Sequence, residues 1–471
     1  MRSRAAGPLW ALAGIVLLAA ALRAWRLGHQ SYWLDETFTA GIVRRDFGGM
    51  LHAVRHTEST PPLYYVLAWL WERVFGWHEA GLRSLSALFG LAAVPAAYAA
   101  ARERFSQRAA LVAAALFAVN PYFVWYSQEA RAYALLVLLC TLSLLFFLRA
   151  ERDGRDTWKW AVVSGLALLT HYFAALLVAP EAAWLLWRRR SRAVLLAAAA
   201  VAAVAAALLP LAIAQRNSGH TLFIADIPFG RRLVSLPKKL ATGELGTPTP
   251  VLGPAIGALL AAGAILALVT ARRAAGLLLG LAAANFALAL VMKLAGLDYF
   301  FPRNLIEAFV PALLAIGAGL AAVRLGPAIG AALALAGIAL VVQVSVNPRL
   351  QRDDWRGAVR ALGPAAAPRA LVVTPEVGRT PLEFYAPRTG PLPAAGARVT
   401  EIAVVANARP PRFAPRPPPP GFRLALARRT ASWEVVRYVS ATPRLIGPNH
   451  ARGLRLDLRS GAAPLVQLGG G

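Results

Sequence analysis

Residues 31–65 read SYWLDETFTAGIVRRDFGGMLHAVRHTESTPPLYY, a charged and aromatic stretch in a chain that is otherwise strongly apolar. An adjacent acidic pair, Asp35 and Glu36, follows Tyr32 and Trp33 near its start. The paired prolines near its end restrict the backbone, and the tyrosines after them suit the headgroup layer of a membrane. The alternative interpretation is an ordinary loop, in which the acidic pair simply faces water. The flanking aromatic residues and prolines favour a held loop at a membrane surface.

The composition indicates a membrane protein. The chain has 471 residues, 58% of them hydrophobic, and a mean hydropathy of +0.53, which exceeds the apolar share of ordinary soluble domains. The formal net charge is +27, and the basic residues fall between apolar stretches, where they set topology and meet anionic lipid. Because no RNP, zinc-finger or helix-turn-helix pattern occurs, nucleic acid is not an expected partner. A single cysteine, Cys140, cannot form an intramolecular disulfide.

Long apolar runs alternate with short basic segments as far as residue 346. At about 20 residues per span, the runs predict about eleven crossings and thus an α-helical polytopic membrane protein. The run over 160–187 is interpreted as a hairpin, broken around His171 and Pro180. The first run, 8–22, also fits a signal peptide, but the many later spans favour a retained first helix.

The arginine clusters predict the orientation of the spans. If the spans alternate, every cluster falls on one side: positions 2–4, 102–108, 149–159, 188–192, 272–273 and 324. The positive-inside rule makes that side cytoplasmic, together with the N-terminus. The first outer loop (28–80), a second long loop (215–250) and the part after residue 346 then lie outside. We expect a multi-pass membrane protein, with its C-terminal domain outside the cytoplasm.

From residue 347 onward, the composition changes to proline, arginine and short apolar runs. Asp353 and Asp354 are placed to cap a helix that ends at Leu362. Four further runs have the character of short strands: 370–373, 401–405, 422–427 and 433–438. The pattern predicts a small extracytoplasmic α/β domain over 347–459 and a disordered tail over 460–471. A wholly unstructured basic tail is the alternative.

The polar residues that topology does not explain collect on the outer side. Besides the acidic pair, they are His52, His56 and Glu58, the segment YSQEARAY at 126–133, His171 and Arg303. Ordinary structural roles remain open for several of them. Glu129 and Arg131 fit an interfacial ion pair, Arg303 fits a side chain that reaches phospholipid headgroups, and His171 fits a helix-end histidine.

The sequence leaves open whether the protein binds a divalent metal as a cofactor. His52 and His56 are four residues apart and would share one helix face. A metal pair normally comes with further Cys or His ligands or an HExxH pattern, and none stands near them. We therefore assign no metal ligand and expect no cofactor, without excluding a divalent ion.

These residue types suit the transfer of a group at the membrane surface. A carboxylate such as that of Asp35 can accept the proton of an acceptor hydroxyl. Arginine side chains can hold a phosphate leaving group and stabilise the charge that develops on it. The chain has no glycine-rich phosphate loop for a nucleotide sugar, so we expect a lipid carrier to deliver the sugar from the bilayer.

The run from Trp33-Leu34-Asp35-Glu36, through TPPLYY at 60–65, to YSQEARAYAL at 126–135 resembles the GT-C glycosyltransferases. Within them it is similar to the bacterial branch of the protein O-mannosyltransferase and aminoarabinose-transferase-like superfamily. The resemblance is specific over 31–148 and follows the topology to residue 346. It implies a GT-C transmembrane catalytic domain over 1–346, a polyprenyl-phosphate sugar donor, and an inverting transfer on the periplasmic face to a lipid, glycan or protein acceptor. It also implies a bacterial inner (plasma) membrane as the location, with the C-terminal domain periplasmic.

The resemblance also assigns roles to residues. Asp35 matches the acidic residue that serves as catalytic base or acceptor anchor, and Glu36 matches the second acidic residue of that motif. Arg303 matches a basic residue placed against the lipid phosphate. We add further donor-phosphate candidates from the same outer side, Arg131, Lys238 and Lys239, and substrate-binding candidates, His56, Glu58, Tyr64, Gln128, Glu129 and His171.

Two positions depart from the aminoarabinose transferases. Those enzymes carry a basic residue just before the paired prolines, where this chain has Thr60, and another shortly after the acidic pair, where it has Phe38. Lipid A is therefore a doubtful acceptor, and other groups must hold the donor phosphate.

A transporter or lipid flippase is the alternative from another functional class. Transporters place ionisable groups near the bilayer midplane, often at broken helices. Here the spans carry almost no charge, and Lys293 and Glu307 lie near helix ends. Glu181, beside Pro180, is the exception. This placement favours the enzyme.

The predicted orientation can be tested by labelling single introduced cysteines from outside the cell. Positions within 40–56, 220–245 and 380–440 should react, and positions within 103–107 and 189–191 should not, because the arginine clusters keep the latter inside. Labelling of a Gly154→Cys variant from the outer face of intact cells would overturn the orientation.

Overall fold

The computed structural model describes residues 6–217, 222–244, 250–407, 416–456 and 460–469. The chain divides into two units by its internal contacts. The first comprises Met1–Leu27 and Ile42–Gln343, and the second comprises Gly28–Gly41 and Val344–Gly471. The acidic pair therefore packs with the C-terminal part of the chain, although it stands between the first two apolar runs in the sequence.

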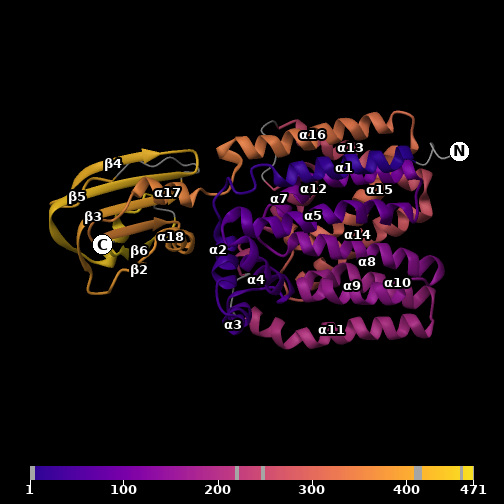
Figure 1. Ribbon diagram of the computed structural model, residues 1–471, viewed down its shortest axis with the longest axis horizontal. Coiled ribbons are helices and arrows are strands. Elements are labelled where there is room, and N and C mark those ends of the chain that lie inside the picture. Colours follow the sequence, from indigo (N-terminus) through magenta and orange to yellow (C-terminus); the bar gives the residue numbers. More distant parts are fainter. Residues whose placement is uncertain (1–5, 218–221, 245–249, 408–415, 457–459, 470–471) are drawn as a thin grey trace. The chain divides into compact units, whose positions relative to one another are not determined.

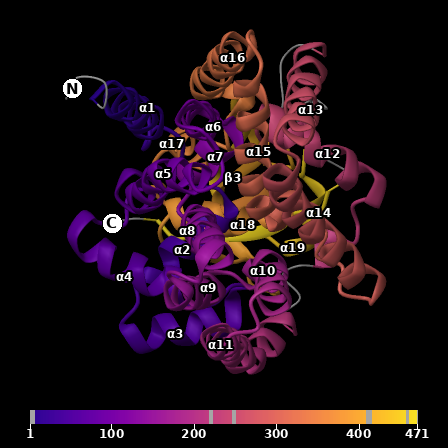
Figure 2. The ribbon, with the colours of Figure 1, turned by 90° about the vertical axis from the view of Figure 1, so that its right-hand side faces the viewer.

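The first unit is built from helices, most of which run side by side in Figure 1. In chain order they are α1 (Ala6–Ala24), α3 (Phe47–Thr57), α4 (Leu63–Phe75), α5 (Glu79–Arg102), α6 (Gln107–Val119), α7 (Pro121–Ser127), α8 (Tyr133–Asp153), α9 (Thr157–Thr170), η1 (Tyr172–Ala174), α10 (Ala175–Arg188), α11 (Arg192–Arg216), η2 (Leu222–Ile224), α12 (Phe229–Thr242), α13 (Leu252–Thr270), α14 (Arg272–Leu294), η3 (Pro302–Ala308), α15 (Phe309–Ala322) and α16 (Gly326–Val346). In the view along the bundle, α8 lies among α5, α7, α9 and α10 (Figure 2).

Among the described residues, seven helices are long and apolar enough to cross a membrane. The count rises to eight if α6 and α7, which meet at a 55° bend, form one broken span. The expected number of about eleven crossings is not confirmed, because α9 and α10 have 14 residues each and the apolar part of α1 is also short. Such a set of apolar helices makes the chain a multi-pass membrane protein.

The basic turns that carry the topology signal are neutralised by neighbouring carboxylates. Arg149 contacts Glu103 (2.7 Å) and Asp156 (3.1 Å), and Arg152 contacts Glu103 (2.6 Å). Arg104 pairs with Glu151. These bridges join the end of α5 to the end of α8, so both turns lie at the same end of the bundle, as the alternation of spans requires.

The second unit is built around a six-stranded sheet with the order β2-β6-β1-β3-β5-β4. Its elements are α2 (Leu34–Val43), η4 (Pro348–Leu350), α17 (Trp355–Leu362), β1 (Arg369–Thr374), η5 (Glu376–Gly378), α18 (Arg379–Tyr385), β2 (Thr389–Pro391), β3 (Ala397–Asn407), β4 (Arg423–Arg429), β5 (Trp433–Ile446), α19 (Pro448–Gly453) and β6 (Ala463–Gln467). β1 and β3 are parallel, and the other pairs are antiparallel. The expected small α/β domain is thus present.

Two apolar cores lie on opposite faces of this sheet, because successive strand residues point to opposite sides. Trp355 and Leu362 of α17 pack with Leu371 and Val373 on one face. Val372, Val404 and Tyr438 contribute to the other face, together with Ala451 of α19. Asp354 accepts a hydrogen bond from the backbone of Gly357 and caps α17, as the sequence predicted.

The expectation of a disordered tail over 460–471 is wrong for 463–467. These residues form β6, which lies between β1 and β2. Its alternating burial matches an inner strand, and Gln467 accepts a hydrogen bond from Arg369 (2.8 Å). The run is short and follows a basic, glycine-containing segment, so the sequence alone resembles a tail. Two neighbouring strands supply the backbone partners that make it a strand.

Candidate active site

Arg131 and Glu58 form a two-pronged ion pair that joins the α7–α8 turn to the end of α3. The two guanidinium nitrogens donate to the two carboxylate oxygens at 2.9 and 3.0 Å. Both side chains are buried, and parallel hydrogen bonds of this kind fix orientation as well as distance. Arg131 thus has Glu58 as a carboxylate partner, whereas the sequence suggested Glu129.

Hydrogen bonds hold the loop that leads into the paired prolines. Gln215, at the end of α11, donates to the carbonyls of Val54 (2.8 Å) and Thr60 (3.0 Å). The buried Tyr64 hydroxyl lies 3.1 Å from Ser86 Oγ, which donates to the Arg131 carbonyl at 3.3 Å. The loop is therefore fastened to α11 and to the turn that carries Arg131. Gln215 was not found from the sequence, because it ends an apolar run 155 residues away.

Gln128 connects α7 to the end of α1. Its side-chain nitrogen donates to the carbonyls of Leu22, Arg23 and Trp25, at 3.1, 3.1 and 3.0 Å. The carbonyls at a helix end lack partners within the helix, so this amide serves as a cap. Gln128 was predicted to bind substrate. In the structure, these contacts join α7 to α1.

A continuous row of rings leads from α7 to the segment before η3. Neighbouring ring centroids are 4.7–5.6 Å apart along the series Tyr122, Tyr126, Tyr133, His171, Phe173 and Tyr299. We call these six residues the aromatic row. They come from α7, α8, η1 and the turns beside them, so the row crosses the helix bundle at the points where helices break.

Arg131 and Arg303 both act on His171, which stands within the aromatic row. His171 is 3% exposed, and the two guanidinium groups disfavour a positive charge on its ring. His171 Nδ1 accepts a hydrogen bond from the Phe173 amide, so the residue caps η1, as a helix-end histidine does. The Arg303 guanidinium lies 5.5 Å from the ring of Phe301 and 5.7 Å from that of Phe223.

The structure distinguishes the two lysines of α12. Lys239 pairs with Glu244, and Glu244 also accepts a hydrogen bond from Tyr126 of the aromatic row (3.2 Å). Lys239 is largely buried, whereas Lys238 is exposed. From the sequence, both lysines were equally good candidates for binding the donor phosphate, because they are adjacent. Glu244 was not found from the sequence, since nothing in a loop glutamate shows which helix it will meet.

His56 and Glu129 complete the predicted residues of the first unit. His56 is exposed on α3, where the centre of its ring lies 4.4 Å from that of His52, with the two rings tilted by 43°. Across the described residues, no group of three or more His, Cys, Asp or Glu side chains is arranged to hold a metal ion. Glu129 is fully buried in the α7–α8 turn, and its carbonyl accepts the amide of Arg131 (2.8 Å).

Asp35 and Glu36 lie in the second unit, in the first turn of α2. A helix N-terminus favours negative charge because its free amide groups point toward it. Glu36 is fully buried, and its carboxylate lies 3.9 Å from Arg352 Nε. The two acidic residues thus have different surroundings. Glu36 is buried and faces a cation of the C-terminal domain, whereas Asp35 is only partly buried.

The segment around the acidic pair is fastened to that domain by backbone and ring contacts. Ser31 Oγ donates to the carbonyl of Asp353 (2.7 Å), and the amide of Tyr32 donates to the hydroxyl of Tyr385 (2.6 Å). The Tyr32 ring meets Phe384 edge-on at 5.8 Å. These contacts with the C-terminal domain could not be predicted from the sequence, because more than three hundred residues separate the partners.

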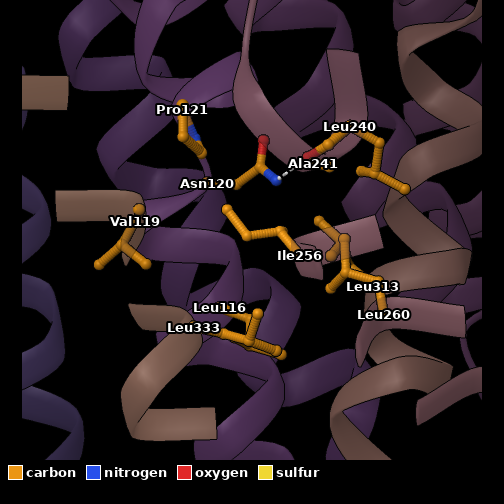
Figure 3. Close-up of a pocket in the computed structure, with 11 residues that line it drawn as sticks. Leu116, Val119, Asn120, Pro121, Leu240, Ala241, Ile256, Leu260, Leu313 and Leu333 are labelled. Atoms are coloured by element: carbon orange, nitrogen blue, oxygen red, sulfur yellow. Dashed lines mark hydrogen bonds between the residues drawn. The ribbon is translucent and has the colours of Figure 1, made fainter. Parts of the chain in front are cut away.

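An apolar cavity lies where α12 meets the break between α6 and α7 (Figure 3). Its volume is about 30 Å³, and it is lined by Leu116, Val119, Asn120, Pro121, Leu240, Ala241, Ile256, Leu260, Leu313, Leu333 and Gly337. The side chain of Asn120 forms part of the cavity lining and donates a hydrogen bond to the Leu240 carbonyl at 2.9 Å. Leu240 directly follows Lys239, so an apolar space begins beside the paired lysine.

Residues 59–214 match the family model of the dolichyl-phosphate-mannose-protein mannosyltransferases. The matched region holds Arg131 and His171, and it leaves out Asp35, Lys239 and Arg303. The match confirms, over this third of the chain, the resemblance to mannosyltransferase-like membrane glycosyltransferases that the motifs indicated. No curated protein matches the chain in sequence.

Three solved structures share part of the arrangement at low identity. ArnT from Cupriavidus metallidurans in the apo state has 16% identity and a TM-score of 0.45, over 92% of this chain and 98% of that one. The Archaeoglobus fulgidus oligosaccharyltransferase has 16% identity and a TM-score of 0.43, over 75% of this chain and 57% of that one. The Pmt1-Pmt2 protein O-mannosyltransferase complex of S. cerevisiae has 18% identity and a TM-score of 0.33, over 44% of this chain and 32% of that one. The chain thus spans about half or less of the last two relatives.

Proposed function

We propose that this chain is an integral membrane glycosyltransferase that moves a sugar from a polyprenyl-phosphate donor to a hydroxyl of an acceptor on the periplasmic face. The transfer inverts the anomeric carbon, and Asp35 is the base. The observation that carries the proposal is the gathering of three cations, Arg131, Arg303 and Lys239, around one aromatic row in the first unit. The family match over residues 59–214 supports the same class of donor.

Two of the cations suit a lipid phosphate because carboxylates hold them in place and little water reaches them to screen their charge. Arg131 is fixed by Glu58, and Lys239 is fixed by Glu244. In a site with little water, such groups interact with a phosphate more strongly than they would in bulk solvent. The apolar side chains beside Lys239, such as Leu240, Ile256 and Leu260, offer the first part of a lipid chain a surface similar to the bilayer.

The reaction then needs one bond to form and one to break. The oxygen of the acceptor hydroxyl attacks the anomeric carbon from the side opposite the phosphate. The bond from that carbon to the phosphate oxygen breaks, and its electron pair stays on the lipid phosphate, where Arg131, Arg303 and Lys239 stabilise the added charge. The acceptor proton passes to the Asp35 carboxylate as the new bond forms. Glu36, which faces Arg352, orients the start of α2.

The transporter alternative would depend on two carboxyl groups inside the bundle. Glu181 accepts hydrogen bonds from Ser143 (2.5 Å) and Trp160 (2.9 Å), and Glu307 accepts one from Asn285 (2.9 Å). Both carboxyl groups are fully buried among side chains of neighbouring helices, where they join those helices. The cations around the aromatic row favour the enzyme instead.

Asp35→Asn should lower the rate of sugar transfer by about 100-fold or more, the usual scale of general-base catalysis, because asparagine keeps the shape but cannot accept the proton. Affinity for polyprenyl phosphate should change little, since the first unit holds the phosphate. Transfer by membranes and binding by purified protein measure the two effects. Asp46→Asn is the matched control, because Asp46 is an exposed helix cap on the same loop. Near wild-type transfer by the Asp35 variant would remove this base from the mechanism.

Lys239→Gln should weaken the binding of polyprenyl phosphate about 10- to 150-fold, since a hydrogen bond from a charged group contributes about 1.5–3 kcal/mol. Lys238→Gln should bind as the wild type does, because this neighbour is exposed and makes no described contact with Glu244. Both variants lose the same charge, so the comparison removes general electrostatic attraction. Equal weakening by both variants, or by neither, would contradict the place given to Lys239.

A further inference from the structure

Arg232 forms a buried ion pair that the proposed chemistry does not use. Its terminal nitrogens donate to the two carboxylate oxygens of Asp298, at 2.7 and 2.8 Å. One of them also donates to the carbonyl of Phe300 at 3.0 Å. The Arg232 side chain is 3% exposed, and that of Asp298 is 24% exposed. A guanidinium this deeply buried needs such partners, because the cost of leaving it unpaired is high.

The pair joins two segments that each lead to a proposed phosphate ligand. Arg232 lies in α12, seven positions before Lys239, which is about two helical turns. Asp298 and Phe300 lie in the irregular segment between α14 and η3, just before Arg303. Phe229 and Phe300 add an edge-on ring contact at 5.2 Å between the same two segments.

The other end of α12 is anchored to α7. Asn120 donates to the Leu240 carbonyl, and Glu244 accepts from Tyr126. Gly243 has a positive φ of 82°, and a Cβ there would lie 3.0 Å from Pro121, so this end of the helix approaches α7 closely. With α7 fixed at one end, the Arg232–Asp298 pair decides where the other end of α12 lies relative to the segment of Arg303.

Apolar packing alone holds α12 weakly. Its buried side chains are those of Arg232, Leu236, Ala241 and Thr242, whereas Leu233 and Val234 are 48% and 71% exposed. Leu236 is thus the one large apolar side chain that α12 buries in its middle. An element with so few buried contacts depends on its specific polar ones.

We infer that Arg232 and Asp298 are positioning residues, whose ion pair sets Lys239 and Arg303 at the separation that lets both contact one donor phosphate. The inference rests on the proposed function, since it assumes that the two cations share a ligand. Neither residue touches the donor. Hydrogen bonds from Arg232 keep the pKa of Asp298 below its ordinary value, so the carboxylate stays charged and the pair stays formed at neutral pH.

The test is a charge exchange in the full chain, with binding of polyprenyl phosphate to purified protein as the readout. Arg232→Asp and Asp298→Arg should each weaken binding about 10- to 100-fold, because a displacement of about 1 Å in a ligand can cost that much. The double variant should recover most of the affinity, since the pair is restored with the charges reversed. Arg231→Asp is the matched control, as Arg231 is the exposed neighbour in α12.

Limited proteolysis of the second outer loop shows whether α12 is held, without any ligand. Each single variant should be cut faster than the wild type, and the double variant should be protected again. Arg232→Lys keeps the charge and serves if the reversals fail to fold. It should also weaken binding, because a single ammonium cannot reproduce the two-pronged contact.

The outcomes separate the inference from the proposed function. If the wild type binds polyprenyl phosphate and the single variants bind equally well while α12 is loosened, the pair only stabilises the loop and the inference is wrong. If the double variant stays as weak as the singles, the pairing is also not what positions the ligands. Failure of the wild type itself to bind polyprenyl phosphate would refute the proposed function, and with it the shared ligand.

Discussion

Inside a bilayer, every backbone polar group must find its partner within the protein, and the rest of this structure depends on that constraint. Helices meet it automatically, but the breaks between them do not. Here polar side chains satisfy the breaks. Asn120 accepts from the amides of Tyr122 and Phe123, Gln128 donates to carbonyls at the end of α1, and Asn304 donates to the Tyr299 carbonyl. The aromatic row and two of the proposed phosphate ligands, Arg131 and Arg303, lie at such breaks.

A second regularity is that three of the buried cations are held by carboxylates. Glu58 holds Arg131, Glu244 holds Lys239, and Asp298 holds Arg232. An ion pair of this kind keeps a cation in place before its ligand arrives, which lowers the cost of ordering it at binding. The carboxylates also explain how a membrane protein tolerates positive charge so close to apolar side chains such as those that line the cavity in Figure 3.

Much of this arrangement could be predicted from the sequence, because it follows from local pattern. The apolar runs, the cap at Asp354 and the four expected strands of the C-terminal domain depend on neighbours in the chain. The rest depends on contacts between distant residues. Residue pattern could not show that 28–41 packs with the C-terminal domain, that 463–467 completes its sheet, or that Lys239 faces inward while Lys238 faces outward.

The central claim is that a polyprenyl-phosphate sugar is the donor. The measurement that tests it most directly is sugar transfer by membranes that contain the chain, supplied with a panel of radiolabelled polyprenyl-phosphate sugars and, in parallel, with the matching nucleotide sugars. The account predicts that at least one lipid-linked sugar is transferred to endogenous acceptor and that nucleotide sugars are inert once the synthesis of lipid-linked sugars is blocked. Transfer from a nucleotide sugar under that block, with every lipid-linked sugar inert, would contradict it.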